Sequence, residues 1–167
     1  TLQEGGMEQL VIDLRNNPGG SLEAVCSIAD ELLGEGPIVF TEQKGKDRTS
    51  KDSDASCLEI PIAVLMNENS ASASEILAGA LQDYGKGIIV GKQSYGKGIV
   101  QSIIDLRDGT ALKVTTAKYY TPKGNDIHKI GITPDVEIDL PDELKSKVEL
   151  SFEEDVQLQK AIEVLQQ

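Results

Sequence analysis

The chain has 167 residues, of which 39% are apolar and 26% are charged, a balance that suits one domain with a sizeable core. The formal net charge of −12 argues against a nucleic-acid partner, because phosphate binding needs clustered Lys and Arg. No apolar run approaches the roughly 18 residues of a membrane span, and no signal peptide is recognisable. Two cysteines and one histidine are too few for a four-ligand structural zinc site.

The first half of the chain alternates between short apolar runs, which predict buried strands, and stretches with helical apolar spacing. The predicted strands are 10–14, 38–41, 62–66 and 88–90, and the predicted helices are 22–33 and 73–84. Residues 42–60 are polar and rich in Lys and Asp, which predicts a long surface excursion or a floppy hairpin. Cys26 falls on the apolar face of the first helix and is expected to act as a small buried hydrophobe. The alternative, if the protein is exported, is a disulfide between Cys26 and Cys57.

The second half of the chain changes to a β pattern. Residues 99–106 and 111–120 are rich in β-branched residues and are separated by a turn that contains Asp-Gly, which predicts a hairpin. Residues 132–138 predict an edge strand, because Pro134 cannot donate to a ladder, and 153–165 predict a last helix. Strand–helix alternation followed by a hairpin predicts an α/β fold with an antiparallel appendage.

Ser72 is the first of the two most informative residues, because it lies where the strand 62–66 turns into the helix 73–84. With the glutamate three residues on, it forms a capping-box pattern, and a structural cap is the simpler interpretation. The same position suits a nucleophile, since the first N–H groups of a helix are unpaired and can bind a developing oxyanion. The N–H of Ala73 is the natural first donor. The turn 17–20, which ends in Gly-Gly, offers a second donor, or forms only a tight turn.

Lys97, the second of these residues, is the candidate base. An amine accepts a proton only in its neutral form, which burial among apolar groups favours. Gly96 and Gly98 would let the main chain pack closely and exclude water, and Gln101 lies four residues on, where it could hold the amine. An ordinary surface lysine is the simpler interpretation of this residue taken alone.

Two competing motifs fail. Residues 91–97 fit G-x-x-x-x-G-K, but Gly98 stands where a phosphate-binding loop needs Ser or Thr, and a strand-like run follows instead of a helix. A Ser-His-Asp triad would need His128, which lies in a polar, loop-like segment, so a solvated loop histidine is expected.

Four blocks of the sequence, 11–20, 70–76, 94–98 and 131–135, together resemble the carboxy-terminal processing proteases, also called tail-specific proteases. The resemblance implies a Clp/crotonase-like core and a serine endopeptidase that cleaves polypeptides near their C-terminal tails without a cofactor. It assigns Ser72 as nucleophile, Lys97 as general base and Gln101 as support of the lysine. The oxyanion donors would be the N–H groups of Ala73 and of Gly20, which is preferred over Gly19.

Members of this family carry an export signal or membrane anchor and a PDZ domain before the core. We therefore expect 1–167 to be a single protease core that is N-terminally truncated, lacks both, comes from an extracytoplasmic protein, and can be inactive alone. The first six residues, which resemble the end of an earlier element, agree with this expectation. The sequence is also compatible with a homo-oligomer. The alternatives are a non-catalytic peptide-binding module on the same fold and a crotonase-type acyl-CoA enzyme, which would not require Ser72 with Lys97.

Overall fold

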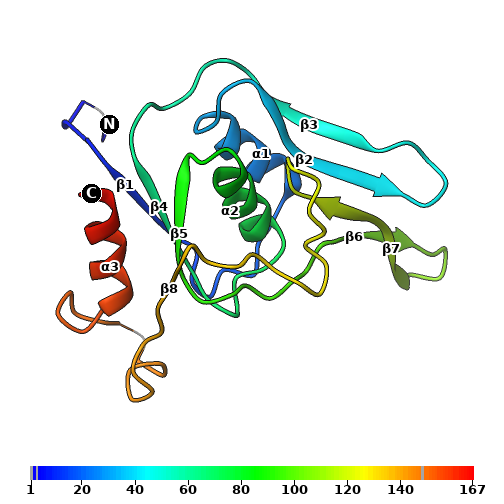
Figure 1. Cartoon of the computed structure of the whole chain (residues 1–167). Coiled ribbons are helices and arrows are strands. Elements are labelled where there is room, and N and C mark those ends of the chain that lie inside the picture. Colours follow the sequence, from blue (N-terminus) through cyan, green and yellow to red (C-terminus); the bar gives the residue numbers. More distant parts are fainter. Residues whose placement is uncertain (1, 3, 148) are drawn as a thin grey trace.

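A parallel sheet lies at the centre of the computed structural model, which describes residue 2, residues 4–147 and residues 149–167 (Figure 1). Thr1 and Gln3, which belong to the expected end of an earlier element, lie outside the described residues. The elements in chain order are β1 (Leu10–Asp13), α1 (Leu22–Asp30), β2 (Gly36–Gln43), β3 (Thr49–Ser53), β4 (Ile62–Met66), α2 (Ala73–Asp83), β5 (Gly87–Gly91), β6 (Ile99–Asp105), β7 (Ala111–Tyr120), β8 (Val136–Glu137) and α3 (Val156–Leu165).

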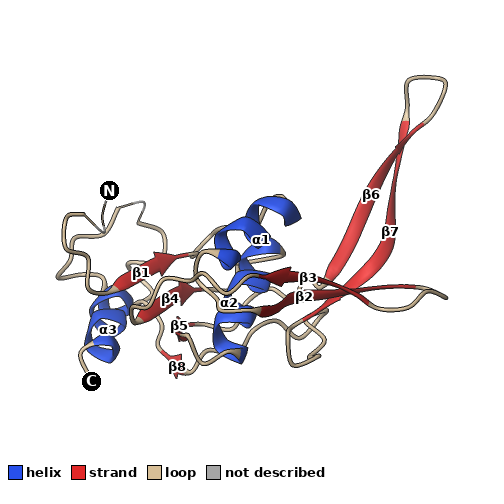
Figure 2. Cartoon of the chain, turned by 90° about the horizontal axis from the view of Figure 1, so that it is seen from above, coloured by secondary structure: helices blue, strands red, loops and turns tan. Residues whose placement is uncertain are grey.

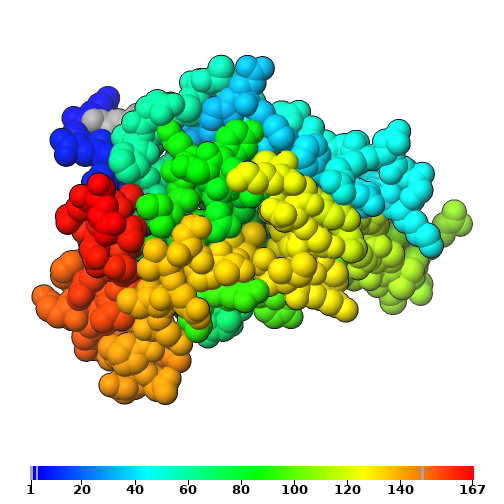
Figure 3. All heavy atoms as spheres, in the orientation of Figure 1, coloured from blue at the N-terminus to red at the C-terminus, as the bar shows by residue number. Residues whose placement is uncertain are grey.

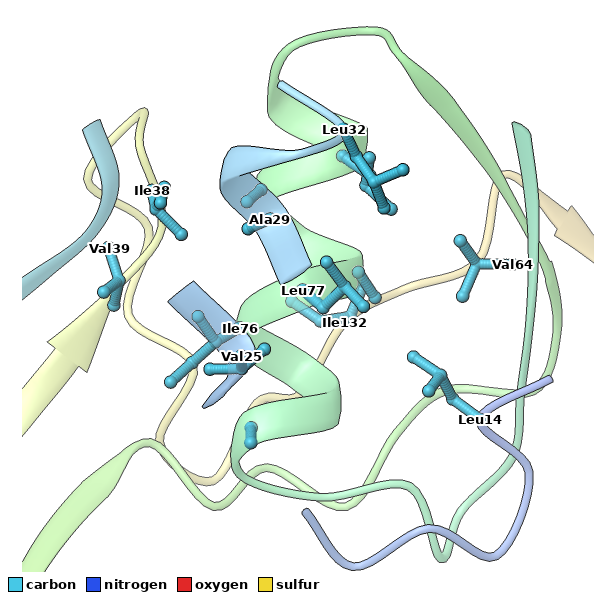
Figure 4. Packing of buried hydrophobic residues seen from close by; sticks show 14 of the residues in the cluster. Leu14, Val25, Ala29, Leu32, Ile38, Val39, Val64, Ile76, Leu77 and Ile132 are labelled. Atoms are coloured by element: carbon cyan, nitrogen blue, oxygen red, sulfur yellow. The ribbon is translucent and has the colours of Figure 1, made fainter. Parts of the chain in front are cut away.

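The parallel sheet has the order β1-β4-β5-β8. Its second strand, β4, is buried along its whole length, because helices cover both faces of the sheet, as crossover connections between parallel strands require. Successive side chains of β4 alternate between two apolar clusters. Val64 belongs to the main core with α1 and α2 (Figure 4), and Ala63 and Leu65 belong to a smaller core with α3.

Helix α2 is the central element of the main core. Nine of its eleven residues, Ala73 to Leu81, are buried, so it is enclosed on nearly all sides rather than on a single stripe. Small residues allow this enclosure: a Cβ added to Gly79 would lie 3.0 Å from the side chains of Ile132 and Thr121. The loop after β7 therefore packs directly on the helix that begins at Ser72.

The second sheet is antiparallel, with the order β3-β2-β7-β6. Its β6–β7 hairpin projects far beyond the rest of the molecule (Figure 2). Paired residues on one face of this hairpin include Ile104 opposite Leu112 and Ser102 opposite Val114. The three aliphatic side chains on this face are exposed, with 48%, 52% and 39% of their surface accessible. The hairpin therefore presents an apolar face that the described residues leave uncovered.

The predicted architecture is confirmed at the level of parallel strands, covering helices and an antiparallel hairpin. Of the two predictions for 42–60, the hairpin is right, since β3 pairs with β2. Only Val136–Glu137 of the predicted edge strand 132–138 pairs, parallel to β5, and Pro134 precedes it. Within the described residues no helix is long and apolar enough to cross a membrane.

Both cysteine thiols are free in the structure. Cys26 is half-buried and packs against the main core, so the predicted role as a small hydrophobe is correct in kind but its burial is incomplete. Burial raises the pKa of the Cys26 thiol. The disulfide with Cys57, which the sequence left open, is not formed.

Helix α3 is fastened to the end of β1 by an ion pair. The Arg15 guanidinium donates to both carboxylate oxygens of Asp155 at 2.8 Å, and Asp155 also caps the helix by accepting from the N–H of Leu158. Burial alone would raise the pKa of Asp155, but the hydrogen bonds from Arg15 and Leu158 and the charge of Arg15 hold that pKa below its ordinary value.

Replacing Asp155 with Ala should lower the free energy of unfolding by about 2–4 kcal/mol, because the change removes a helix cap and a charge-assisted pair. Chemical denaturation measures this loss. The matched control is Asp142→Ala, whose side chain is 93% exposed and forms an ion pair with Lys145; that change should stay within about 0.5 kcal/mol. Equal effects of the two variants would contradict the fastening role.

The stabilisation by Asp155 should depend on pH. A carboxyl whose pKa is lowered in the folded state contributes stability above its unfolded pKa and loses it as the pH falls through the folded value. The difference in unfolding free energy between the native protein and Asp155→Ala should therefore be constant down to about pH 4 and shrink below it. Denaturation curves between pH 7 and pH 3 test this, and a difference that does not shrink would refute the assignment.

Candidate active site

Ser72 occupies a strained turn between β4 and α2. Its backbone has φ 58° and ψ −115°, a conformation that costs a residue with a side chain about 1–3 kcal/mol. Ser72 and Glu75 form a capping box in outline, but only the hydrogen bond from the Ser72 N–H to the Glu75 carboxylate, 2.8 Å, is well formed, and the Ser72 hydroxyl makes no cap hydrogen bond. The hydroxyl is therefore available for another role.

The two neighbouring serines have the structural roles that Ser72 lacks. Ser70 is fully buried, and its hydroxyl donates to the carbonyl of Leu14 at 2.7 Å. The hydroxyl of Ser74 donates to the carbonyl of Asn17 at 3.0 Å. Both bonds tie the turn after β4 to the turn after β1, which places Ser72 beside the Gly-Gly segment.

Gly19 and Gly20 differ in what their N–H groups can do. The N–H of Gly19 donates to the side chain of Asn17 at 2.9 Å, whereas the N–H of Gly20 has no acceptor among the described residues. The N–H of Ala73, at the first helical position, is likewise without an acceptor in the part of the chain that the structure describes. Two free N–H groups beside a serine hydroxyl are the arrangement that stabilises an oxyanion.

Glu75 joins the Ser72 turn to the Lys97 segment. It is fully buried, and one carboxylate oxygen accepts from the N–H groups of both Ser72 and Lys97 at 2.8 Å. The other oxygen accepts from the Ser94 hydroxyl at 2.5 Å and from the N–H of Gly96 at 2.6 Å. The backbones of the two candidate catalytic residues are thus held by the same atom.

Lys97 is half-buried, and its flanking glycines pack closely as predicted. A Cβ added to Gly98 would collide with the backbone of His128, and one added to Gly96 would lie 3.0 Å from the N of Ile130. The resting site is loose, however. Within the described residues neither the Lys97 amine nor the Ser72 hydroxyl has a side-chain partner, so no hydrogen bond joins them.

Gln101 lies on the exposed start of the β6–β7 hairpin, next to an irregularity in the pairing between Val100 and Gln101. Its side chain has no hydrogen bond to Lys97 in the described structure. His128 was expected to be a solvated loop histidine, and this is wrong. It is half-buried against Gly98, and its Nδ1 is buried without a hydrogen-bond partner among the described residues, because the loop after β7 folds back over the Lys97 segment.

The residues after β5 lead directly into strand β6, as expected when the G-x-x-x-x-G-K pattern was rejected as a phosphate-binding loop. A serine on a sharp, strained turn from a strand into a helix, with free N–H groups at its side, is instead typical of hydrolases that use a serine nucleophile.

Comparison with known proteins agrees with this class. Residues 1–138 match the sequence model of peptidase family S41. The chain belongs to this family.

Two individual relatives match most of this chain. The chain is 44% identical over 165 residues to the carboxyl-terminal-processing protease of Synechocystis sp., covering 98% of this chain and 38% of that protein. It is 45% identical over 140 residues to a probable CtpA-like serine protease of Staphylococcus aureus, covering 81% of this chain and 28% of that protein. The predicted resemblance is confirmed, and the chain spans well under half the length of these relatives.

Solved structures show the same fold. The photosystem II D1 C-terminal processing protease matches with a TM-score of 0.77 and 42% identity, over 84% of this chain and 38% of that one. A putative S41 protease from Bacteroides fragilis matches with a TM-score of 0.80 at 18% identity, over 99% of this chain and 46% of that one, which speaks for the fold alone.

The central role of Glu75 was not predicted from the sequence, in which this residue is only the acidic member of a capping box. A signal was present, because six small or apolar residues, 76–81, follow Glu75 in the helix, and a carboxylate that such a helix buries needs several donors.

Gly19 and Gly20 provide a matched test of the turn beside Ser72. In Gly19→Ala the new Cβ would lie 2.5 Å from the Ala71 carbonyl oxygen and 2.7 Å from the Ala73 N, at a φ of +91°. We expect this change to lower the free energy of unfolding by about 2–5 kcal/mol. Gly20→Ala, whose Cβ meets nothing within 4 Å, should cost less than about 1 kcal/mol. Urea denaturation of both variants measures the contrast, and similar losses would refute the packing described.

Glu75→Gln should loosen both halves of the site, since an amide nitrogen would face backbone donors that need acceptors. We expect a loss of about 1–3 kcal/mol in unfolding free energy and faster amide hydrogen exchange at residues 72 and 97. Glu68→Gln, an exposed position in the loop after β4, is the control and should change neither quantity. Unchanged exchange in Glu75→Gln would show that the carboxylate does not hold the two segments.

Proposed function

We propose that this chain is the catalytic core of a serine endopeptidase that cleaves polypeptides near their C-terminal tails, with Ser72 as the nucleophile and Lys97 as the general base. The observation that carries the proposal is the strained Ser72 turn, whose hydroxyl makes no cap hydrogen bond and whose backbone shares one Glu75 oxygen with the backbone of Lys97. Membership of peptidase family S41 supports the same reaction.

The reaction proceeds through an acyl-enzyme. The neutral Lys97 amine takes the Ser72 hydroxyl proton as Oγ attacks the peptide carbonyl carbon, and the N–H groups of Ala73 and Gly20 bind the oxygen that becomes negative. The protonated Lys97 then gives its proton to the leaving amine. Water, activated by the neutral Lys97, hydrolyses the ester by the same route.

Two geometric steps precede this chemistry. The Lys97 amine has to approach the Ser72 hydroxyl, and a substrate chain that covers the site would exclude water from it. We assign Gln101 the role of holding the amine, which requires its side chain to turn from the surface toward Lys97. The loose resting site agrees with an enzyme whose dyad aligns only when substrate or other parts of the protein are in place.

We propose that 1–167 form a single protease core of Clp/crotonase type, that an export signal and a PDZ domain complete the protein, and that it works outside the cytoplasm. The cleavage of C-terminal tails is carried from the relatives, which are named as carboxyl-terminal-processing proteases.

The dyad is tested in the complete protein with a fluorophosphonate probe and a fluorogenic peptide. Ser72→Ala should abolish both labelling and hydrolysis while lowering the free energy of unfolding by no more than about 0.5 kcal/mol, because the hydroxyl makes no cap hydrogen bond. Lys97→Ala should reduce hydrolysis about 10²–10⁴-fold, and Gln101→Ala should reduce it less. Ser102→Ala and Lys113→Ala, both on the hairpin, serve as matched controls and should leave the rate unchanged.

Hydrolysis at the normal rate with alanine at position 72 would overturn the proposal. A protein that binds peptides but neither labels nor cleaves would establish the alternative, a peptide-binding module on the same fold.

A further inference from the structure

A pocket of about 330 Å³ lies where the C-terminal end of helix α2 meets the loop 121–133. In Figure 1 this loop (yellow to gold) follows strand β7 and runs beside α2 (green). We call the pocket the α2 pocket. Its volume is that of roughly eleven water molecules, so it has room for one long side chain together with a smaller neighbour.

The apolar part of the α2 pocket consists of three isoleucines from the loop. Ile127 and Ile132 belong to the main core, whereas Ile130 is 57% exposed. A single exposed aliphatic residue is ordinary, but this one lines a pocket whose other wall is a helix, where a bound group would cover it. The loop therefore offers hydrocarbon contact to an incoming side chain.

The charged part of the α2 pocket is acidic. Asp83 and Asp126 line it, and none of its lining residues, all of which the structure describes, is basic. Asp126 is paired with Lys118 at 2.9 Å. One oxygen of Asp83 accepts from the N–H of Lys123 at 2.8 Å, and its other oxygen has no partner among the described residues. Asp83 is also the last residue of α2, whose final turn, all of it described, carries no basic residue, so the negative end of the helix dipole adds to its charge.

The tip of the β6–β7 hairpin carries a cation that would complement this pocket. The chain has three arginines, and two of them, Arg15 and Arg48, are paired with carboxylates. Arg107 is exposed, and within the described residues it has no hydrogen bond or ion pair. Leu106 beside it leaves 40% of its surface accessible, while Asp108 on its other side accepts hydrogen bonds from within the turn. The tip therefore presents a guanidinium next to an apolar side chain.

The hairpin tip cannot reach the α2 pocket of its own chain. The hairpin projects away from the rest of the molecule (Figure 2). Strand β7 has ten residues and therefore separates the tip from the loop 121–133 by about 30 Å. A contact between the tip and the pocket has to join two molecules.

We propose that the α2 pocket receives the hairpin tip of a second copy of this chain. The aliphatic stem of Arg107 and the side chain of Leu106 pack on the isoleucines, and the guanidinium donates to the free oxygen of Asp83. Charge complementarity favours this occupant, because the pocket is acidic and Arg107 is the arginine that no carboxylate holds. The inference concerns assembly and goes beyond the proposed function.

One such contact is small, so a closed arrangement is needed for a measurable affinity. In a two-fold dimer each tip occupies the partner's pocket, and the same contact forms twice. The exposed side chains of Ile104, Leu112 and Val114, which lie on the hairpin behind the tip, extend the surface that the partner covers. We expect a dimer that dissociates on dilution.

Sedimentation velocity of the complete protein over a wide range of concentrations measures this dimer. Arg107→Glu removes the cation from the tip, and Ile130→Lys places a cation in the pocket, so each change should weaken dimerisation about tenfold or more. The double variant places a carboxylate opposite an ammonium and should recover most of the wild-type affinity. Recovery in the double variant is specific to positions that meet.

Both substituted positions are exposed, so folding should be preserved, and thermal unfolding checks it. Lys46→Glu, in the exposed turn between β2 and β3, makes the same change of net charge as Arg107→Glu and should leave the dimer unchanged. In concentrated wild-type protein, amide hydrogen exchange should slow at 106–108 and at 121–133 relative to dilute protein.

A monomer at every concentration would overturn the proposal, and so would a dimer that neither single variant weakens. Assembly is measured without hydrolysis, so the Ser72→Ala variant should dimerise like the wild type. The outcome is therefore independent of whether Ser72 is the nucleophile.

Discussion

The candidate site depends on one buried carboxylate. Glu75 accepts four hydrogen bonds, from Ser72, Ser94, Gly96 and Lys97, inside a core that excludes water. A carboxylate at the start of a helix is further stabilised by the helix dipole. An unpaired charge at this depth would be very unfavourable, so the carboxylate needs these donors in place. This is why two segments 25 residues apart in sequence, one with the serine and one with the lysine, keep a common position.

The strained turn at Ser72 is stable for the same reason. A backbone with positive φ persists only where its surroundings over-determine it. Here the N–H of Ser72 is held by Glu75, while the hydroxyls of Ser70 and Ser74 hold the turn on both sides. Gly19 lies so close to this turn that no side chain would fit between them. These constraints position the Ser72 hydroxyl without using it, which leaves that oxygen free for chemistry.

Two parts of the molecule, helix α3 and the β6–β7 hairpin, extend in opposite directions from the Ser72 turn. The C-terminal residues (orange and red) and the tip of the β6–β7 hairpin lie at opposite ends of the molecule (Figure 3). Helix α3 packs its apolar face on the parallel sheet, and its cap residue Asp155 is paired with Arg15. The β6–β7 hairpin, in contrast, exposes an apolar face to solvent. The Ser72 turn is therefore held by several hydrogen bonds, whereas the hairpin that follows Lys97 projects away from the rest of the molecule (Figure 2).

Local pattern was enough for much of this protein. Alternation of apolar runs with helical spacing predicted the α/β layout, an Asp-Gly turn predicted the hairpin, and the capping pattern predicted that a helix starts at Ser72. These features are encoded within a few residues of each other, so the chain reveals them without a fold. The family likewise followed from four short blocks whose order is visible in the sequence.

Only the tertiary structure decided which donors and acceptors meet. Nothing local shows that Glu75 reaches the backbone of Lys97, that Asn17 occupies the N–H of Gly19 and leaves that of Gly20 free, or that His128 is folded against Gly98 instead of lying in solvent. The tertiary structure also decided the bounds of β8 and of the helices. These outcomes depend on contacts between residues distant in sequence, whose free energy is set by burial and by competition for hydrogen-bond partners, and neither exists until the chain has folded.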